Sequence, residues 1–280
     1  MQKQHIIGGL LGLITLLVMS ATGVKTAFAE TYDGVRNVEK TVVVKPRGNP
    51  TETKKIENRN MEHSAYESTG IFLYAGEELE IVMNEEPEDL QLRVGQWGTY
   101  ENVPYLTDIS NIFGNGTRTI TRGVTRFKRE DTGGMVYIVN YSKTKTETVT
   151  IRGGVEVPHF IDGETTDEEF VDQLTTYKDV PFMEIESDFI LATIRMDRAK
   201  DIMLKKGQAR KFIDAATKTA RIISETAGFS ENGIGLAKKS PQRIHISNPT
   251  SGIGSLYATS NYLGIHSGTK KDREIFNMSG

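Results

Sequence analysis

The sequence predicts an α+β protein in which an antiparallel β-sandwich is followed by a mixed unit of helices and strands. Two observations lead to this fold class. Between residues 65 and 157, six short runs of alternating apolar and polar residues are separated by turn sequences such as NEEPED and FGNGT, a spacing typical of antiparallel sandwiches. After residue 158 the apolar residues instead recur at the spacing of helices.

Residues 1–29 have the layout of a secretory signal peptide. A short polar start with Lys3 is followed by an apolar run over 6–19 and by small residues at Ala27 and Ala29, as in a cleaved leader. A transmembrane anchor is the alternative, but this run is shorter than the ~20 residues needed to cross a bilayer and contains glycines. We therefore expect cleavage after Ala29, a secreted extracellular protein, and no membrane segment after cleavage.

The composition limits the partners of the mature chain. Removing the leader takes Lys3 and Lys25 from a chain of net charge −3, which leaves −5. Neither this charge nor any basic cluster favours binding to nucleic acid or to a membrane surface. The sequence contains no cysteine, so disulfides and thiolate metal sites are excluded.

The segments before and within the sandwich are assigned from composition and alternation. Residues 30–64 are expected to form a polar amino-terminal segment and linker, with one strand candidate at 41–45 and a loop at 46–60. Residues 65–157 are expected to form the β-sandwich domain. Its strands are predicted at 70–74, 79–83, 90–94, 124–128, 135–139 and 148–151.

Residues 158–280 are expected to form a partial α+β domain. Thr165 and Glu168 have the spacing of a capping box, which predicts that a helix begins there. A strand is predicted at 190–194. A helix is predicted over about 206–227, with Gly228 at the position of a C-cap.

The residues that carry chemistry form no local catalytic or metal motif. Histidines occur at positions 5, 63, 159, 245 and 266, and His245 and His266 are 21 residues apart, whereas H-E-x-x-H requires two histidines on adjacent turns of one helix. There is no G-x-S-x-G nucleophile motif. The carboxylates of DGETTDEEF could form a glycosidase pair, but a solvated helix N-terminus explains them better. We predict no catalytic residue, no metal ligand and no cofactor in this chain.

Aromatic residues offer the remaining candidate site. Trp97 and Tyr100 lie in the loop GQWGTYENVPY, where aromatic rings could form a platform for sugar rings or could cap the sandwich core, and the edge of the core is favoured. A second aromatic segment, NPTSGIGSLYATSNYLGIHSG (residues 248–268), contains Tyr257 and His266. Trp97, Tyr100, Tyr257 and His266 are the candidate substrate-binding residues.

Six segments in this order resemble the enhancin-like zinc metallopeptidases of peptidase family M60. They are STGIFLYAGEELEIVM, LQLRVGQWG, GGMVYIVN, VTIRGGVEVPHFIDGETTDEEF, FMEIESDFILATI and the segment 248–268. The resemblance covers about residues 65–268. It implies a secreted peptidase directed at mucin-like, O-glycosylated proteins, with a β-sandwich ahead of a zincin-like α/β catalytic domain that binds zinc.

In the resembled family the H-E-x-x-H helix follows the counterpart of segment 248–268, and this sequence contains no such motif. The resemblance therefore implies the amino-terminal region of a metallopeptidase, with an incomplete zincin-like domain, truncated and catalytically inactive alone. A fragment of a divided enzyme would have the same sequence. The alternative function is a secreted, non-enzymatic module that binds mucin or other glycans.

Overall fold

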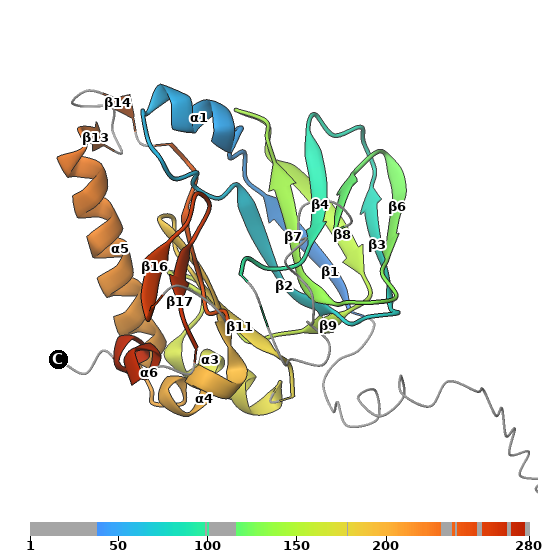
Figure 1. The fold of residues 1–280 in the computed structure, drawn as a ribbon. Helices are drawn as coiled ribbons and strands as arrows, with labels where there is room; N and C mark the ends of the chain where they lie inside the picture. The colour runs from blue at the N-terminus through green and yellow to red at the C-terminus, as the bar shows by residue number, and fades with distance from the viewer. Residues whose placement is uncertain are drawn as a thin grey trace, which may run out of the picture. The chain divides into compact units, whose positions relative to one another are not determined.

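The structure, a computed structural model, describes residues 38–98, 100, 116–177, 179–230, 237–238, 240–250, 254–267 and 270–277. Its first part is a sandwich of two antiparallel sheets with strand orders β1-β8-β3-β6 and β5-β4-β7-β2-β9 (Figure 1). The strands are β1 (Glu39–Val44), β2 (Tyr66–Leu73), β3 (Glu78–Met83), β4 (Leu90–Val94), β5 (Thr117–Thr119), β6 (Gly123–Lys128), β7 (Gly134–Asn140), β8 (Glu147–Arg152) and β9 (Val155–Glu156).

The six strands expected from alternation are confirmed as parts of β2, β3, β4, β6, β7 and β8. Strand β2 begins earlier than expected, at Tyr66, and contains a bulge between Ser68 and Ile71. Gly70, in the bulge, has φ +66, a conformation in which any side chain is strained. The bulge interrupts the period of two, which is why alternation alone placed the start of the strand too late.

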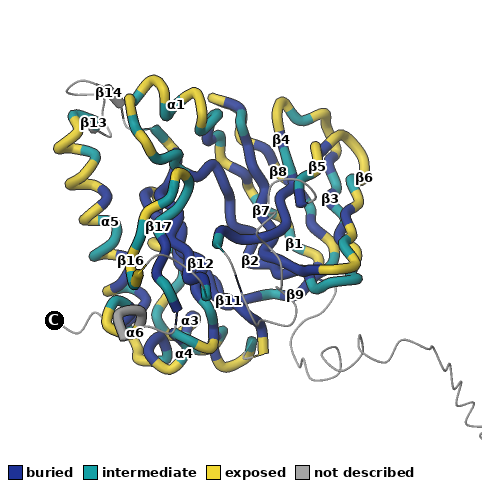
Figure 2. The backbone as a smooth tube through the Cα atoms, viewed as in Figure 1, coloured by how far each residue is buried: buried dark blue, intermediate teal, exposed yellow. Residues whose placement is uncertain are grey.

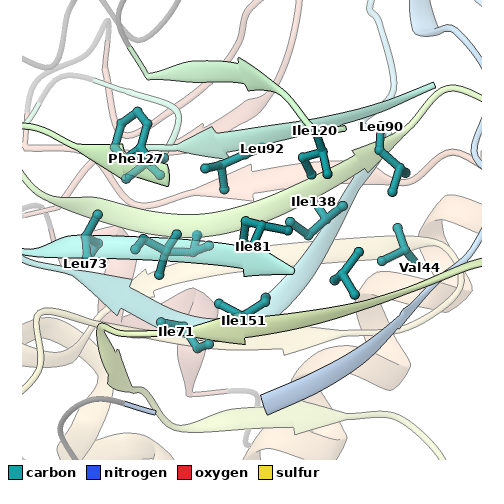
Figure 3. Packing of buried hydrophobic residues seen from close by; sticks show 14 of the residues in the cluster. Val44, Ile71, Leu73, Ile81, Leu90, Leu92, Ile120, Phe127, Ile138 and Ile151 are labelled. Atoms are coloured by element: carbon teal, nitrogen blue, oxygen red, sulfur yellow. The ribbon is translucent and has the colours of Figure 1, made fainter. Parts of the chain in front are cut away.

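The sandwich core consists of the inward-facing side chains of both sheets. Leu92 and Ile138 come from one sheet and Ile81 and Phe127 from the other, and all four belong to one buried cluster (Figure 3). Neighbouring residues such as Glu80 and Arg126 point outward and pair with each other. Apolar and polar residues therefore alternate in the sequence because successive side chains point alternately into the core and toward solvent.

Residues 38–56 contain more regular structure than their composition indicates. The strand candidate at 41–45 overlaps β1 over residues 41–44, and β1 pairs with β8 and completes a sheet of the sandwich. The expectation of a loop throughout 46–60 is wrong, because α1 (Pro50–Ile56) lies within it. The Asn49 side chain accepts hydrogen bonds from the backbone of Thr51 and Glu52, and Pro50 occupies the first turn. A high proline and glycine content indicates a loop, but proline is also favoured at this helical position.

The second part of the fold is built on a six-stranded mixed sheet of order β10-β11-β12-β15-β17-β16. Its strands are β10 (His159–Ile161), β11 (Phe182–Glu186), β12 (Ile190–Arg195), β15 (Ile244–Ser247), β16 (Leu256–Ala258) and β17 (Leu263–Ile265). Its helices are α3 (Asp167–Thr176), α4 (Met196–Met203), α5 (Gln208–Thr226) and α6 (Lys270–Phe276). A short parallel pair, β13 (Phe229–Ser230) and β14 (Ala237–Lys238), follows α5. The predicted α+β class is confirmed.

The two faces of this sheet differ in chemistry. Successive side chains of each strand point to opposite faces, and the pairing register aligns residues of the same kind on neighbouring strands. Helix α5 packs against β11 and β12 on the apolar face. The opposite face contacts β2 and β7 of the sandwich through polar side chains. Register pairs place on the apolar face Met183, Ile185, Ile190, Ala192, Ile194, Ile244, Ile246, Leu263 and Ile265. The same pairs place on the polar face Glu184, Thr193, His245 and Ser247.

The ends of α3 and α5 test the predicted helix signals. The capping box is formed by Thr166 and Glu169, one residue later than expected. Thr165 instead accepts a hydrogen bond from the backbone N–H of Ile161 and donates one to the carbonyl of His159. Both threonines have an acid three residues later, so the sequence pattern fits an N-cap at either Thr165 or Thr166. Gly228, with φ +85, follows the end of α5 as predicted.

Candidate functional site

Four aromatic rings, contributed by β2, the segment after β4, β16 and the turn between β16 and β17, form a continuous row. Trp97 stacks between Tyr66 and Tyr262, with ring centroids 6.0 and 5.9 Å away. Tyr257 meets Tyr262 edge to face at 6.0 Å. The Arg93 guanidinium lies 5.5 Å from the Tyr66 centroid and 5.4 Å from the Trp97 centroid, within cation–π range. We call Tyr66, Trp97, Tyr262 and Tyr257 the aromatic row.

Of the candidate residues from the first aromatic loop, Trp97 lies within this row, and Tyr100 is hydrogen-bonded to the Trp97 backbone beside it. Trp97 is 7% exposed and Tyr100 is 1% exposed. The Tyr100 hydroxyl donates to the Trp97 carbonyl at 2.9 Å and is 2.9 Å from the Ser247 hydroxyl. Burial raises the pKa of the Tyr100 phenol. The favoured position at the core edge fits this burial, and a substrate-binding role for Trp97 and Tyr100 stays a prediction.

Tyr257 explains part of the glycine and tyrosine content of segment 248–268. Tyr257 and Gly264 are directly opposite each other on β16 and β17. A Cβ on Gly264 would overlap the Tyr257 ring, so the glycine leaves room for the ring to lie across the strand. The ring is partly exposed. It therefore forms the accessible end of the aromatic row together with Tyr262.

His266 closes the same segment on itself and lies outside the aromatic row. Its Nδ1 is 3.1 Å from the Gly254 carbonyl oxygen, and its Nε2 is 2.9 Å from the Thr250 carbonyl oxygen. Both ring nitrogens are therefore directed at backbone carbonyl oxygens of the same segment. The structure thus brings Trp97, Tyr100 and Tyr257 into one aromatic region, and gives His266 contacts to its own loop.

Sequence reasoning missed a buried polar network between the sandwich and the six-stranded sheet. Glu184 accepts hydrogen bonds from the hydroxyls of Ser68, Tyr137 and Thr193, the last two at 2.7 and 2.8 Å. Thr193 is also 3.0 Å from Nε2 of His245. Burial raises the pKa of Glu184 and lowers the pKa of His245 to about 3. We call these five residues the junction network.

A second group, the charge cluster, lies beside the junction network. Arg243 bridges Glu186 of the sheet and Glu67 of the sandwich. Arg47 also binds Glu67, at 2.8 Å, and His159 binds Glu186 at 3.1 Å. Burial alone would raise the pKa of Glu186, but the charges and hydrogen bonds of Arg243 and His159 hold it at about 2.

The charge cluster borders a cleft of about 570 Å³ that is also lined by Lys40, Thr41 and Asp188. Lys40 donates to the Thr69 carbonyl at 2.9 Å, and burial lowers its pKa. The acids and bases of the cluster are engaged with one another across the junction. The cluster therefore links the sandwich to the sheet, and the loss of one partner would leave buried charge with fewer counter-charges.

The residues that the structure describes do not fit a zinc site. Among the residues that the structure describes, no group of three histidines or acids is placed to hold a metal ion. His159 is bound to Glu186, and His245 is bound to Thr193.

No helix in the described part of the chain is long and apolar enough to span a membrane.

Two family profiles match adjacent parts of the sequence. The profile described as the N-terminal domain of M60-like peptidases matches residues 48–152. The profile described as Peptidase M60, enhancin and enhancin-like, matches residues 153–279. Their common boundary falls at the end of β8.

Solved structures share the fold at low sequence identity. A conserved protein of unknown function from Bacillus anthracis has a TM-score of 0.73 and 21% identity, over 86% of this chain and 47% of its own. The ZmpB metallopeptidase from Clostridium perfringens has a TM-score of 0.65 and 17% identity, over 85% and 50%. The M60 catalytic domain of ZmpC from the same organism, solved with the sialyl T antigen, has a TM-score of 0.62 and 17% identity, over 82% and 48%.

A curated mouse protein, TRPM8 channel-associated factor 3, is 29% identical over 167 residues, which is 55% of this chain and 17% of that protein. This chain thus spans about half the length of the solved structures that it matches, and less of the curated relative. The two adjacent profile matches and the shared fold agree with each other. The chain belongs to the M60 family of enhancin and enhancin-like peptidases.

Proposed function

We propose that this chain is the secreted amino-terminal region of an enhancin-like metallopeptidase directed at mucin-like glycoproteins, and that it is catalytically inactive alone. One observation carries the proposal. The two family profiles match the chain side by side over 48–279, while the solved structures of the same fold are about twice as long. In a metallopeptidase, zinc polarises the peptide carbonyl and activates the attacking water. The H-E-x-x-H motif that would hold it does not occur in this sequence.

The proposed substrate class comes from the structural neighbours. The ZmpC catalytic domain was solved with the sialyl T antigen, and another metallopeptidase of TM-score 0.62 was solved with the Tn antigen. Both ligands are glycan antigens, which supports a glycoprotein substrate for the assembled enzyme. Among the described residues, the accessible end of the aromatic row, Tyr257 and Tyr262, has a chemistry that suits a sugar ring.

Incubation with a sialylated, O-glycosylated mucin tests the inactivity of the chain. We expect the purified protein with added zinc to leave the mucin intact on gels, and we expect calorimetry at neutral pH to detect no stoichiometric zinc. Zinc-dependent cleavage by this chain alone would overturn the proposal. The ligands would then be sought by substituting His159, His245 and His266 in turn. Cleavage that survives a chelator would indicate an unrelated mechanism.

Secretion is tested separately. Protein recovered from the culture medium is expected to begin at or near Glu30, because residues 1–29 have the charge, length and small residues of a cleaved leader. Amino-terminal sequencing or intact mass measurement decides this. A membrane-bound product that retains Met1 would contradict it.

Glycan binding without hydrolysis is the second candidate function, and the accessible end of the aromatic row favours it. A Tyr262→Ala variant removes the ring that stacks on Trp97. If the row binds sugar, this variant should lose binding to a sialyl T glycan by about tenfold or more, the range for one aromatic contact. Tyr177→Ala is the matched control, because Tyr177 is also a partly exposed tyrosine but lies at the end of α3. Equal binding by both variants would exclude the row.

A further inference from the structure

The edge strand β1 borders the cleft of about 570 Å³ with its free side. It is the outermost strand of its sheet, and β8 is its single neighbour in the sheets that the structure describes. Odd- and even-numbered residues of β1, from Lys40 to Val43, all line the cleft. A sheet face would contribute only every second residue. The cleft therefore runs along the edge of β1.

The backbone of β1 directs polar groups into this cleft. The Gly153 N–H donates to the Val38 carbonyl at 2.8 Å, so Val38 and every second residue after it hydrogen-bond with β8. The N–H and C=O groups of Thr41 and Val43, which lie between them, point away from β8. Exposed and partly buried residues alternate along the strand (Figure 2), and Val43 is 61% exposed. Such an edge is a template for a further strand.

The edge strand β10, which borders the same cleft, has the opposite arrangement. The His159 N–H donates to the Gln173 side chain at 2.7 Å. The Ile161 N–H donates to the Thr165 hydroxyl at 3.0 Å, and this hydroxyl donates to the His159 carbonyl. Side chains of the protein thus cover the edge of β10, a common protection against further pairing. The run Val42–Val44 of β1 contains no proline or charged residue, and β-branched residues favour strands.

The walls of the cleft suit a single extended segment. Besides β1, they include Glu67–Thr69 of β2 and the segment after β10. An added strand would lie about 4.8 Å from β1. The same walls border β1 in a second copy of this chain, which disfavours pairing between two folded edges. A linear segment brings no such walls.

The accessible charges around the cleft favour a basic segment. The residues of the charge cluster compensate one another. Asp162 is paired with Arg210 at 2.6 Å, whereas the exposed Glu164 has no ion pair among the described residues. The side chain of Asp188 is 82% exposed and lies 3.9 Å from Lys45. A lysine or arginine of an added segment would complement these acids.

We propose that the edge of β1 binds an extended basic segment of a separate polypeptide, which joins the sheet as a further strand. The backbone of the segment pairs with Thr41 and Val43, and a lysine or arginine side chain reaches Glu164 or Asp188. The inference goes beyond the proposed function, because the cleft lies within this chain and the binding requires neither zinc nor cleavage.

Peptides selected on the purified chain test the edge. The probe is a library of random linear dodecapeptides displayed on phage. Val43→Pro removes an outward N–H but no hydrogen bond to β8, a position where an edge strand tolerates proline. We expect selected peptides, rich in β-branched and basic residues, to bind Val43→Pro about tenfold more weakly than the wild type. The matched control Val43→Thr keeps the N–H and should bind as the wild type does. Peptides that bind all three proteins equally would overturn the inference.

The charge preference is measured with the same peptides. Glu164→Gln should weaken their binding about two- to fivefold, the range of an exposed ion pair. Glu85→Gln removes an exposed acid outside the cleft and should have no effect. Equal effects of the two variants would contradict a specific contact with Glu164.

Two further readouts need no protein variant. Methylating one peptide amide at a time should weaken binding about tenfold at every second position, because only alternate N–H groups face the neighbouring strand. In hydrogen exchange followed by NMR, the Val42 amide of the free protein should be protected, and those of Thr41 and Val43 should become protected only when the peptide binds.

These readouts also identify other occupants. Protection of Thr41 and Val43 in the free protein would mean that another part of the chain or a second copy already covers the edge, and would overturn the inference. A methylation pattern without a period of two, or bound peptide that leaves both amides unprotected, would place the peptide elsewhere and would also overturn it.

Discussion

His245 should make the stability of this protein depend on pH below neutrality. The ring is fully buried in the junction network, 3.0 Å from the Thr193 hydroxyl, and burial lowers its pKa to about 3. In the unfolded chain an imidazole has a pKa of about 6.5. Between these values the unfolded chain binds a proton that the folded protein does not, so this contribution to stability is complete above about pH 6.5 and is lost as the pH falls toward about 3.

The size of the effect follows from the difference in proton binding. Each pH unit in this window changes the free energy of unfolding by about 1.4 kcal/mol for one proton. At about pH 5, His245 should therefore make the protein about 2 kcal/mol less stable than at about pH 7.5. A folded-state pKa one unit higher would change this figure by only about 0.1 kcal/mol, because at about pH 5 the folded ring would still be largely neutral.

The assay is urea unfolding across this pH range, followed by the fluorescence of Trp97, the single tryptophan. His245→Gln keeps a polar group that can reach Thr193 and removes the titration. Its stability should fall by about 2 kcal/mol less than that of the wild type between about pH 7.5 and 5. His266→Gln, which removes a partly exposed histidine, should retain the difference due to His245. If wild type and His245→Gln lose stability in parallel, His245 does not stay neutral in the folded protein.

Three further substitutions test other contacts. Arg243→Met should lower the free energy of unfolding by about 3–5 kcal/mol, because Glu67 and Glu186 lose the buried guanidinium that they share and keep only Arg47 and His159 as partners. Arg152→Met, which breaks an exposed pair, should cost less than about 1 kcal/mol. Equal costs would mean that the charge cluster is solvated. Gly264→Ala should lower the free energy of unfolding by about 1–3 kcal/mol, because the added methyl group displaces the Tyr257 ring. If this is the cause, the double variant Gly264→Ala/Tyr257→Ala should lose less stability than the two single variants together. A loss equal to their sum would contradict it. Thr166→Ala should cost about 1 kcal/mol by removing the cap of α3, and an unchanged thermal midpoint would show that the cap does not contribute.

Alternation predicted most of the sandwich, because strands such as β3 and β8 have one face in the core and one face in solvent. It failed at the bulge around Gly70, where the period of two is interrupted. Helix α1 was missed because Pro50 is a signal both for loops and for the first turn of a helix. These errors are local, and each comes from one residue type that has two structural uses.

The candidate site was harder to predict because its contacts join distant parts of the chain. Trp97 was chosen from its loop, but its neighbours Tyr66 and Tyr262 lie on other strands or loops. Arg243 and Glu67, 176 residues apart, pair inside the protein, whereas charged residues in a sequence are expected at the surface. One signal was available in FMEIE (Phe182–Glu186), where acids alternate with apolar residues, because this alternation places both carboxylates on one face of a strand.

The alternation of the six-stranded sheet also constrains how this protein can change during evolution. In β11, Glu184 faces the sandwich hydroxyls while Ile185 lies on the face covered by α5. Inserting or deleting one residue would turn a carboxylate toward isoleucines and an isoleucine toward Tyr137, so both interfaces of the sheet would fail at once. Natural variation in these strands should therefore be confined to substitutions, with a tolerance that switches between polar and apolar at every second position, while insertions and deletions accumulate in the connecting loops.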